Sequence, residues 1–295
     1  MERMKAFWNK PSHVAYLFIA PVMILFLLFN FIPLVASFFI STLDVTTQLN
    51  RAEFVGVGNF IEVFQDGRFW NSLLVTFKWT LIEVPAQVLI ALLLAALLTK
   101  NTKFNKLCRG IYFLPVICSA TAVAIMWRMI LHSNVGYITY MLNNIGFGKI
   151  NFMNDPGLTF YVIVFMSVWK SFGISTIILV SAMQNVPHEL YESAELDHAN
   201  KFQQFWNITL PCISPSLWFV LMTRVIGSLQ VFDIVYTTTG GGPNFTTETL
   251  VTYVYTRAFD VNRMGYASAL SECLFVIILL ITVVLYGRMM KQENS

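Results

Sequence analysis

Few residues of this chain have the types and spacing that an enzyme or metal site requires. The four histidines, at positions 13, 132, 188 and 198, form no His-Glu-x-x-His pattern, and no Gly-x-Ser-x-Gly motif is present. The single Gly-Lys pair, Gly148-Lys149, lacks the upstream glycine and the following Ser or Thr of a nucleotide-binding loop. We therefore expect no catalytic residue, no metal site and no cofactor in this chain.

The longest polar interruption between apolar segments covers residues 187–215, called the docking loop below. Pro187 is typical of a helix start, and Glu189 and Glu192 favour the positive end of that helix. Pro211 and Pro215 are expected to break the helical run before the next apolar segment. The pattern predicts a short acidic helix on which another protein surface can dock.

Ionisable residues inside apolar segments form a second candidate site. Lys170 lies near the middle of one such segment, where a charge is expensive and normally faces a cavity or a partner charge. Two hypotheses stay open: Lys170 donates to substrate hydroxyls or acts as a gate, or it pairs structurally with Glu83. Arg224 is expected to lie nearer the end of its segment, where extension of its side chain toward water explains it equally well.

The segment 230–243 contains a further candidate for substrate contact. The Asp233 carboxylate, flanked by Phe232 and Tyr236, is suited to accept hydrogen bonds from sugar hydroxyls. Gly241 and Gly242 expose backbone amides that a ligand can approach closely. The alternative is a flexible turn without a ligand.

Composition determines which elements must position these residues. Of 295 residues, 56% are hydrophobic and 12% are charged, and the mean hydropathy is +0.64. Soluble domains contain roughly 25% charged residues, so the chain is predicted to be an integral membrane protein. A net charge of +3 gives no indication of a nucleic-acid partner, and four scattered cysteines indicate no disulfide.

The apolar segments predict an all-α membrane protein with about six transmembrane helices, since roughly 20 apolar residues cross a bilayer. One transmembrane domain, 14–290, is expected between the tails 1–13 and 291–295. The docking loop falls between the fourth and fifth spans. The expected spans are 14–43, 73–98, 110–131, 158–183, 217–236 and 266–285.

Loop charges predict the orientation. Lysine and arginine number ten on the loops of the amino-terminal side, including Arg3, Lys5 and Lys10, against five on the other side, including Arg51. By the positive-inside rule, both termini and the docking loop are expected to be cytoplasmic.

The docking loop resembles the EAA loop of binding-protein-dependent ABC importer permeases. The likeness rests on Glu192-Ser193-Ala194, on Asp197-His198-Ala199 and on Ile208-Thr209-Leu210-Pro211 at the family's spacing. Ser193 replaces the first alanine of the motif, and His198 stands where glycine is usual. Because glycine takes positive φ most easily, His198 is expected to alter the turn.

The stretch from Asp233 to Leu250 is similar to the carbohydrate branch of these permeases. The matching residues are Asp233, Tyr236, Thr239, Gly241, Gly242, Pro243, Thr247, Thr249 and Leu250. The resemblance implies a multi-pass permease subunit in the cytoplasmic (inner) membrane of a prokaryote. Its implied partners are a second permease, two ATPase subunits that bind ATP and Mg²⁺, an external solute-binding protein and a sugar.

Within this resemblance, Glu189, Glu192, Ser193, Ala194, Asp197, His198 and Ala199 are expected to contact the ATPase. Lys170, Asp233, Tyr236, Gly241 and Gly242 are expected along the substrate path. Two alternatives remain: an ABC permease for a non-sugar solute, such as a polyamine or phosphate ester, or a secondary transporter that works alone.

Overall fold

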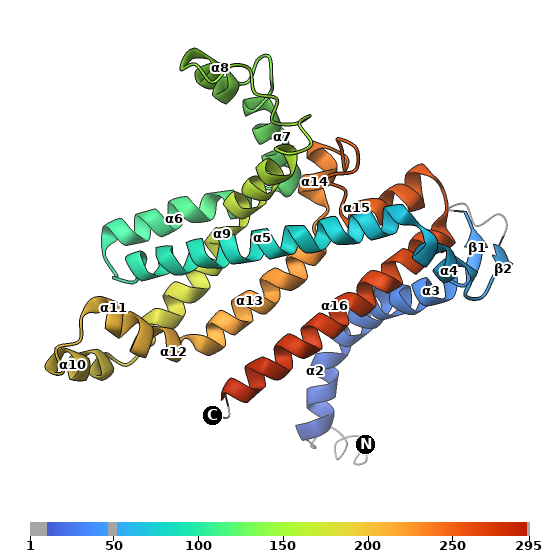
Figure 1. The fold of residues 1–295 in the computed structure, drawn as a ribbon. Helices are drawn as coiled ribbons and strands as arrows, with labels where there is room; N and C mark the ends of the chain where they lie inside the picture. The colour runs from blue at the N-terminus through green and yellow to red at the C-terminus, as the bar shows by residue number, and fades with distance from the viewer. Residues whose placement is uncertain (1–10, 47–51, 294–295) are drawn as a thin grey trace. The chain divides into compact units, whose positions relative to one another are not determined.

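The computed structural model describes residues 11–46 and 52–293 (Figure 1). Residues 1–10 of the predicted amino-terminal tail, the last two residues of the carboxyl-terminal tail and Arg51 lie outside this range. Contacts divide the chain into two compact units: unit 1 contains residues 1–65 and 254–273, and unit 2 contains residues 66–253 and 274–295. Each unit is described by itself.

Unit 1 consists of helices and the one small sheet in the described part of the chain. The hairpin pairs Leu43 with Phe54 in antiparallel register. The sheet begins at Leu43, the last residue of the expected span 14–43, and the apolar pattern predicts no strand there. Its elements are α2 (Pro11–Phe26), η1 (Leu27–Phe31), α3 (Ile32–Ile40), β1 (Leu43–Val45), β2 (Ala52–Phe54), α4 (Gly58–Gln65) and η3 (Thr256–Asp260).

A buried asparagine organises unit 1. The Asn59 amide donates to the carbonyl oxygens of Ser41 and Leu43, at 2.8 and 2.9 Å. Gly265 passes so close to this turn that a Cβ on it would lie 1.8 Å from the Leu43 carbonyl oxygen. Only glycine therefore permits this approach of α16 (Met264–Glu293), whose residues 264–273 belong to unit 1 and the remainder to unit 2.

Unit 2 contains the two candidate sites and most of the helices. Its elements are α5 (Gly67–Leu98), α6 (Lys103–Ile117), α7 (Ala120–Ile130), α8 (Tyr137–Asn144), α9 (Thr159–Gln184), α10 (His188–Leu196), α11 (Lys201–Gln204), η2 (Phe205–Thr209), α12 (Leu210–Cys212), α13 (Ser214–Leu229) and α14 (Asp233–Thr238). A further short helix, α15 (Leu250–Tyr255), crosses the boundary between the units.

Within residues 11–46 and 52–293, four helical runs are long and apolar enough to cross a membrane, and six spans result if each of two bent helix pairs counts as one. The all-α membrane fold is confirmed. Two predicted spans are wrong in detail. The third bends by 96° between α6 and α7, and the fifth ends at Leu229, with a 70° bend before it between α12 and α13.

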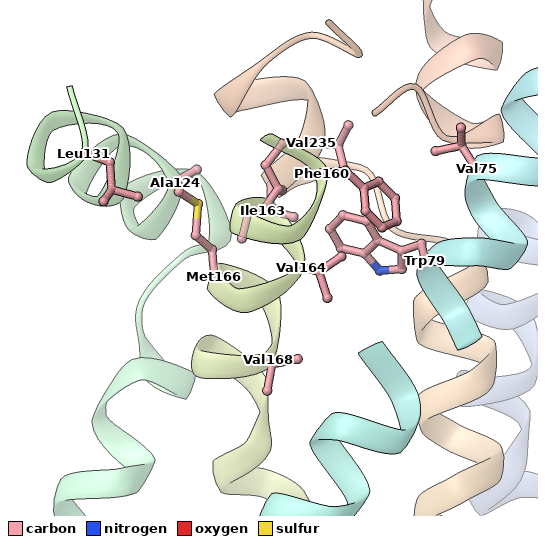
Figure 2. Packing of buried hydrophobic residues seen from close by; sticks show 11 residues of the cluster. Val75, Trp79, Ala124, Leu131, Phe160, Ile163, Val164, Met166, Val168 and Val235 are labelled. Carbon is pink, nitrogen blue, oxygen red and sulfur yellow. The ribbon is translucent and has the colours of Figure 1, made fainter. Parts of the chain in front are cut away.

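The core of unit 2 lies where α5 and α9 pack against α7 and α14. Figure 2 shows Trp79 of α5 facing Phe160 of α9, and their ring centroids lie 5.9 Å apart in an edge-to-face arrangement. Val235 of α14 is fully buried in the same cluster. Burial of Val235 and its neighbour Ile234 holds α14 in place. Asp233, the first residue of α14, is therefore held in place as well.

Candidate functional site

The docking loop presents its predicted contact residues on an exposed helix, α10, which has no buried residue. Glu189 and Glu192 are exposed, and Ser193 donates to the Glu189 carbonyl oxygen at 2.9 Å. The Glu192 carboxylate lies 3.0 Å from the His188 ring nitrogen Nδ1, one turn earlier. The His188 side chain is 84% exposed and the Glu192 side chain is 67% exposed. The helix therefore leaves its carboxylates available to a partner. Of the remaining predicted residues, Ala194 lies on α10 and Ala199 follows it, both half-buried.

Helix α10 ends in a Schellman motif built around His198. The Ala199 amide donates to the Ala194 carbonyl at 2.9 Å, and the His198 amide donates to the Glu195 carbonyl at 3.1 Å. Asp197 is the C-cap, and His198 adopts φ +57°, the left-handed conformation that this motif requires after the cap. The turn at His198 therefore has the shape that glycine favours, so the altered turn expected for a histidine at this position is wrong.

Side-chain contacts connect α10 to the rest of the docking loop. The Tyr191 hydroxyl lies 2.8 Å from the Thr209 hydroxyl, and the Lys201 ammonium donates to the Glu195 carboxylate at 2.9 Å. This hydrogen bond lowers the pKa of the exposed Glu195 carboxyl. A capping box between Asn200 and Gln203 begins α11. The loop is thus one connected unit.

The predicted proline break occurs later than expected. The helical run passes through Pro211 to Cys212, and the bend follows at Ile213. The π-helical segment η2 precedes this proline. Its wider backbone accommodates the Pro211 ring, which has no amide hydrogen to donate to a regular helix. Pro215 lies in the first turn of α13, where proline is well tolerated.

The residues predicted along the substrate path divide between two places. Lys170 and Asp233 line one pocket of about 270 Å³ in unit 2, together with Glu83 and Arg224. This pocket, called the charged pocket below, lies between α5, α9, α13 and the start of α14. Its other polar lining residues are Ser167, Ser171, Ser228 and Gln230. Formally, two carboxylates and two cations face this space, and their charges cancel.

Within the charged pocket, Glu83 interacts with partners other than Lys170. Its carboxylate accepts a hydrogen bond from Ser167 at 3.2 Å, and the cation that acts on it electrostatically is Arg224. No ion pair joins Lys170 and Glu83 in the part of the chain that the structure describes. Lys170, a half-buried residue, therefore lines the pocket without this predicted pair.

Tyr236 stacks on Phe232, a lining residue of the charged pocket, with ring centroids 5.1 Å apart and planes at 20°. The two glycines lie elsewhere. Gly242 lines a separate polar cavity of about 320 Å³ with Arg128 and His132. Gly241 has φ +97°, and a Cβ on it would lie 3.0 Å from the Glu248 Cβ.

The reason for this close approach is a buried ion pair under residues 239–249, called the glycine loop below. Both carboxylate oxygens of the fully buried Glu248 accept from the Arg68 guanidinium, at 2.8 and 2.7 Å, and Ser72 donates at 3.2 Å. The guanidinium also lies 3.9 Å from the Phe245 ring centroid. This arrangement fixes the loop on the first turns of α5.

Several residues of the glycine loop and of the charged pocket were not predicted from the sequence. Arg68 and Glu248 are 180 residues apart, and no local pattern relates them. Ser167 and Ser171 were also missed, although their four-residue spacing beside Lys170 puts them on one face of α9 and could have indicated a polar lining.

Comparisons with known proteins cover both loops. The profile of a family described as "Binding-protein-dependent transport system inner membrane component" matches residues 54–289. The chain is 36% identical over 285 residues to the probable ABC transporter permease protein YesP of Bacillus subtilis, spanning 94% of this chain and 91% of that protein. It is 31% identical over 275 residues to the trehalose/maltose transport system permease protein MalF of Thermococcus litoralis, spanning 93% of each.

Among solved structures, the fold is similar to a chain of a bacterial ABC transporter involved in the import of the acidic polysaccharide alginate. The TM-score is 0.83, the sequences are 24% identical, and the superposition covers 98% of both chains. This likeness confirms the predicted importer-permease fold.

Proposed function

The chain belongs to the family of binding-protein-dependent transport system inner membrane components, and from this premise we propose that it is the transmembrane subunit of an ATP-driven importer for an uncharged sugar. Members of this family are transport components, so the chain itself is a permease subunit and not an enzyme. Its partners in this proposal are a second permease, two ATPase subunits that bind ATP and Mg²⁺, and an external solute-binding protein. Both termini and the docking loop face the cytoplasm of a prokaryotic cell.

The observation that carries the sugar assignment is the charge balance of the charged pocket. A polyamine would favour an excess of carboxylates, and a phosphate ester or acidic polysaccharide would favour an excess of cations. The pocket has two of each, together with serine hydroxyls and the Gln230 amide. Groups of both signs suit the hydroxyls of a neutral sugar, since a hydroxyl both donates and accepts.

The size of the pocket supports contact with a short segment of a sugar. Its volume of about 270 Å³ is below the roughly 300 Å³ at which pockets for drug-sized ligands begin. The similarity to the trehalose/maltose permease supports the same class of solute. The alginate importer shares only the fold at 24% identity, so its acidic substrate is not transferred to this chain.

In this proposal the docking loop couples transport to ATP hydrolysis. Closure of the ATPase dimer pushes α10, and the connection from Tyr191 to Thr209 transmits that push to α12 and, across the bend at Ile213, to α13. Arg224 and Ser228 on α13 line the charged pocket. A connected route of this kind lets movement at the docking loop change the pocket.

The test begins with purification of the tagged complex from its native membrane and mass identification of its subunits. ATP hydrolysis by the reconstituted complex, with its binding protein, is then measured with maltotriose, an alginate trisaccharide and spermidine as probes. Stimulation by the neutral sugar alone supports the proposal. Stimulation only by the acidic sugar or by spermidine would overturn the sugar assignment, and recovery of the chain without an ATPase would overturn the importer assignment.

Lys170→Met sharpens this test, with Lys78→Met as its matched control. The Lys78 ammonium lies over the Phe160 and Tyr161 rings, at 4.5 and 5.1 Å from their centroids, and does not line the pocket. We expect Lys170→Met to reduce sugar-stimulated hydrolysis about tenfold with normal protein yield, since a hydrogen bond to a charged group contributes about 1.5 kcal/mol. A lower yield without a transport defect would assign Lys170 a structural role instead.

A further inference from the structure

A second cavity of unit 2 lies behind the docking loop and has no role in the proposed substrate path. This loop cavity, of about 800 Å³, is formed by the end of α5, the end of α9 and the docking loop itself. Ala96 lines it from α5, Thr99 and Lys100 line it from the residues just after α5, and Met183 lines it from α9. Because α5 and α9 are apolar spans, their ends mark the bilayer surface, and the cavity lies at the level of the lipid headgroups.

The lining of the loop cavity is amphipathic. Ala96, Met183 and Phe205 supply apolar surface, Lys100 and Lys201 supply positive charge, and Glu195 supplies one carboxylate. Lys201 shares its charge with Glu195 at 2.9 Å, whereas in the described part of the chain the Lys100 ammonium has no ion-pair partner. An unpaired cation therefore lies beside an apolar space.

The surrounding charges increase this positive character. Lys103 and Lys106 are exposed at the start of α6, directly after Lys100. Arg109 does not contribute in the same way, because its guanidinium donates to the backbone carbonyls of Leu98, Thr99 and Lys100 and caps the end of α5. The basic turn is thus free to attract an anion, while its geometry is held by an arginine.

Exposed aromatic residues lie next to the cavity. Phe202, which lines it, and Trp206, one turn later, are 71% and 51% exposed, with ring centroids 6.0 Å apart. Aromatic side chains of this kind are enriched at the membrane–water interface. Their position supports contact of this part of the docking loop with the bilayer surface.

We propose that the loop cavity binds one anionic phospholipid, with an acyl chain against its apolar wall and the phosphate beside Lys100. Basic pockets between membrane helices at the bilayer surface are suited to such headgroups. The lipid would bridge the end of α5 and the docking loop, so that lipid composition affects the position of α10. This inference does not depend on which solute is transported.

The test is native mass spectrometry of the purified complex, taken from nanodiscs of equal parts phosphatidylcholine and phosphatidylglycerol. We expect the wild type to retain one phosphatidylglycerol molecule. Lys100→Gln should reduce that retention about fivefold, which corresponds to the loss of about 1 kcal/mol for one lysine near an anionic surface. Lys149→Gln, which removes an equal charge away from this cavity, should leave retention unchanged.

Ala96→Trp provides a second variant that fills the cavity and removes no charge. It should reduce phosphatidylglycerol retention as well, because the acyl chain loses its space against the apolar wall. Equal retention of the two lipids by the wild type, or unchanged phosphatidylglycerol in Lys100→Gln, would overturn the proposal. Loss of an ATPase subunit in Lys100→Gln, with lipid retention unchanged, would instead identify the cavity as a protein interface.

Discussion

The glycine loop and the docking loop lie at opposite ends of α5 and bury their charges to very different degrees. In the glycine loop, Glu248 is fully buried and accepts from both Arg68 and Ser72. In the docking loop, the Lys201–Glu195 pair has 84% and 58% of its side chains exposed. The first loop is built to hold one shape. The second keeps its charges in water, where a partner can reach them.

The two loops are also held in place by different kinds of contact. The glycine loop is held by contacts distant in sequence, including the Asn71 side-chain amide donating to the Phe245 carbonyl oxygen at 3.1 Å. The docking loop is held mainly by contacts between near neighbours, such as the capping box and the Schellman motif. Substitutions in the glycine loop should therefore affect stability, and substitutions in the docking loop should affect coupling.

The largest expected effect is that of Glu248→Gln. Loss of one partner from a buried ion pair costs about 3–5 kcal/mol, and the low end applies because Arg68 is 28% exposed. We expect a large decrease in the melting temperature of the purified protein in detergent. Glu195→Gln, in the exposed pair of the docking loop, is the control and should leave the melting temperature unchanged; equal effects of the two variants would contradict the comparison.

Gly241→Ala should have the next largest effect. Its φ of +97° and the Glu248 Cβ at 3.0 Å both oppose a side chain, which corresponds to about 2 kcal/mol of strain. Gly240→Ala is the matched control, because Gly240 has φ +60° with open space around it and should cost only about 1 kcal/mol. Thermal unfolding of both variants measures the difference, and a more stable Gly241→Ala protein would show that the contact with Glu248 relaxes easily.

For the docking loop, Glu192→Lys should reduce substrate-stimulated ATP hydrolysis by the whole complex at least tenfold, while melting stays unchanged. The substitution places a cation where the ATPase is expected to supply a donor to a carboxylate. Glu53→Lys, an exposed change on β2, is the control. Unaltered stimulation in Glu192→Lys would remove this carboxylate from the coupling contact.

The smallest expected effect is that of His198→Gly, which should stabilise the protein by about 1 kcal/mol. Glycine adopts φ +57° without the strain that a side chain imposes. His198→Ala keeps a Cβ and should melt at about the temperature of the wild type. A lower melting temperature for His198→Gly would show that the imidazole makes a stabilising contact.

The sequence alone determined the class of the protein and the character of its docking loop. Hydropathy runs identify spans because each span must bury apolar side chains in lipid along its own length. The helix signals of α10 are likewise local: Pro187 before the helix and Glu189 in its first turn are visible within a few residues. These features follow from neighbours in the chain, so they can be predicted from it.

Only the tertiary structure decided what the buried charges contact. The sequence offered Glu83 as a partner for Lys170, but Ser167 donates to that carboxylate, and Arg224 acts on it from another helix. The pair of Arg68 and Glu248 and the bends within two spans were also beyond prediction. Such contacts depend on how helices distant in sequence pack, because a buried charge takes the nearest suitable partner in space.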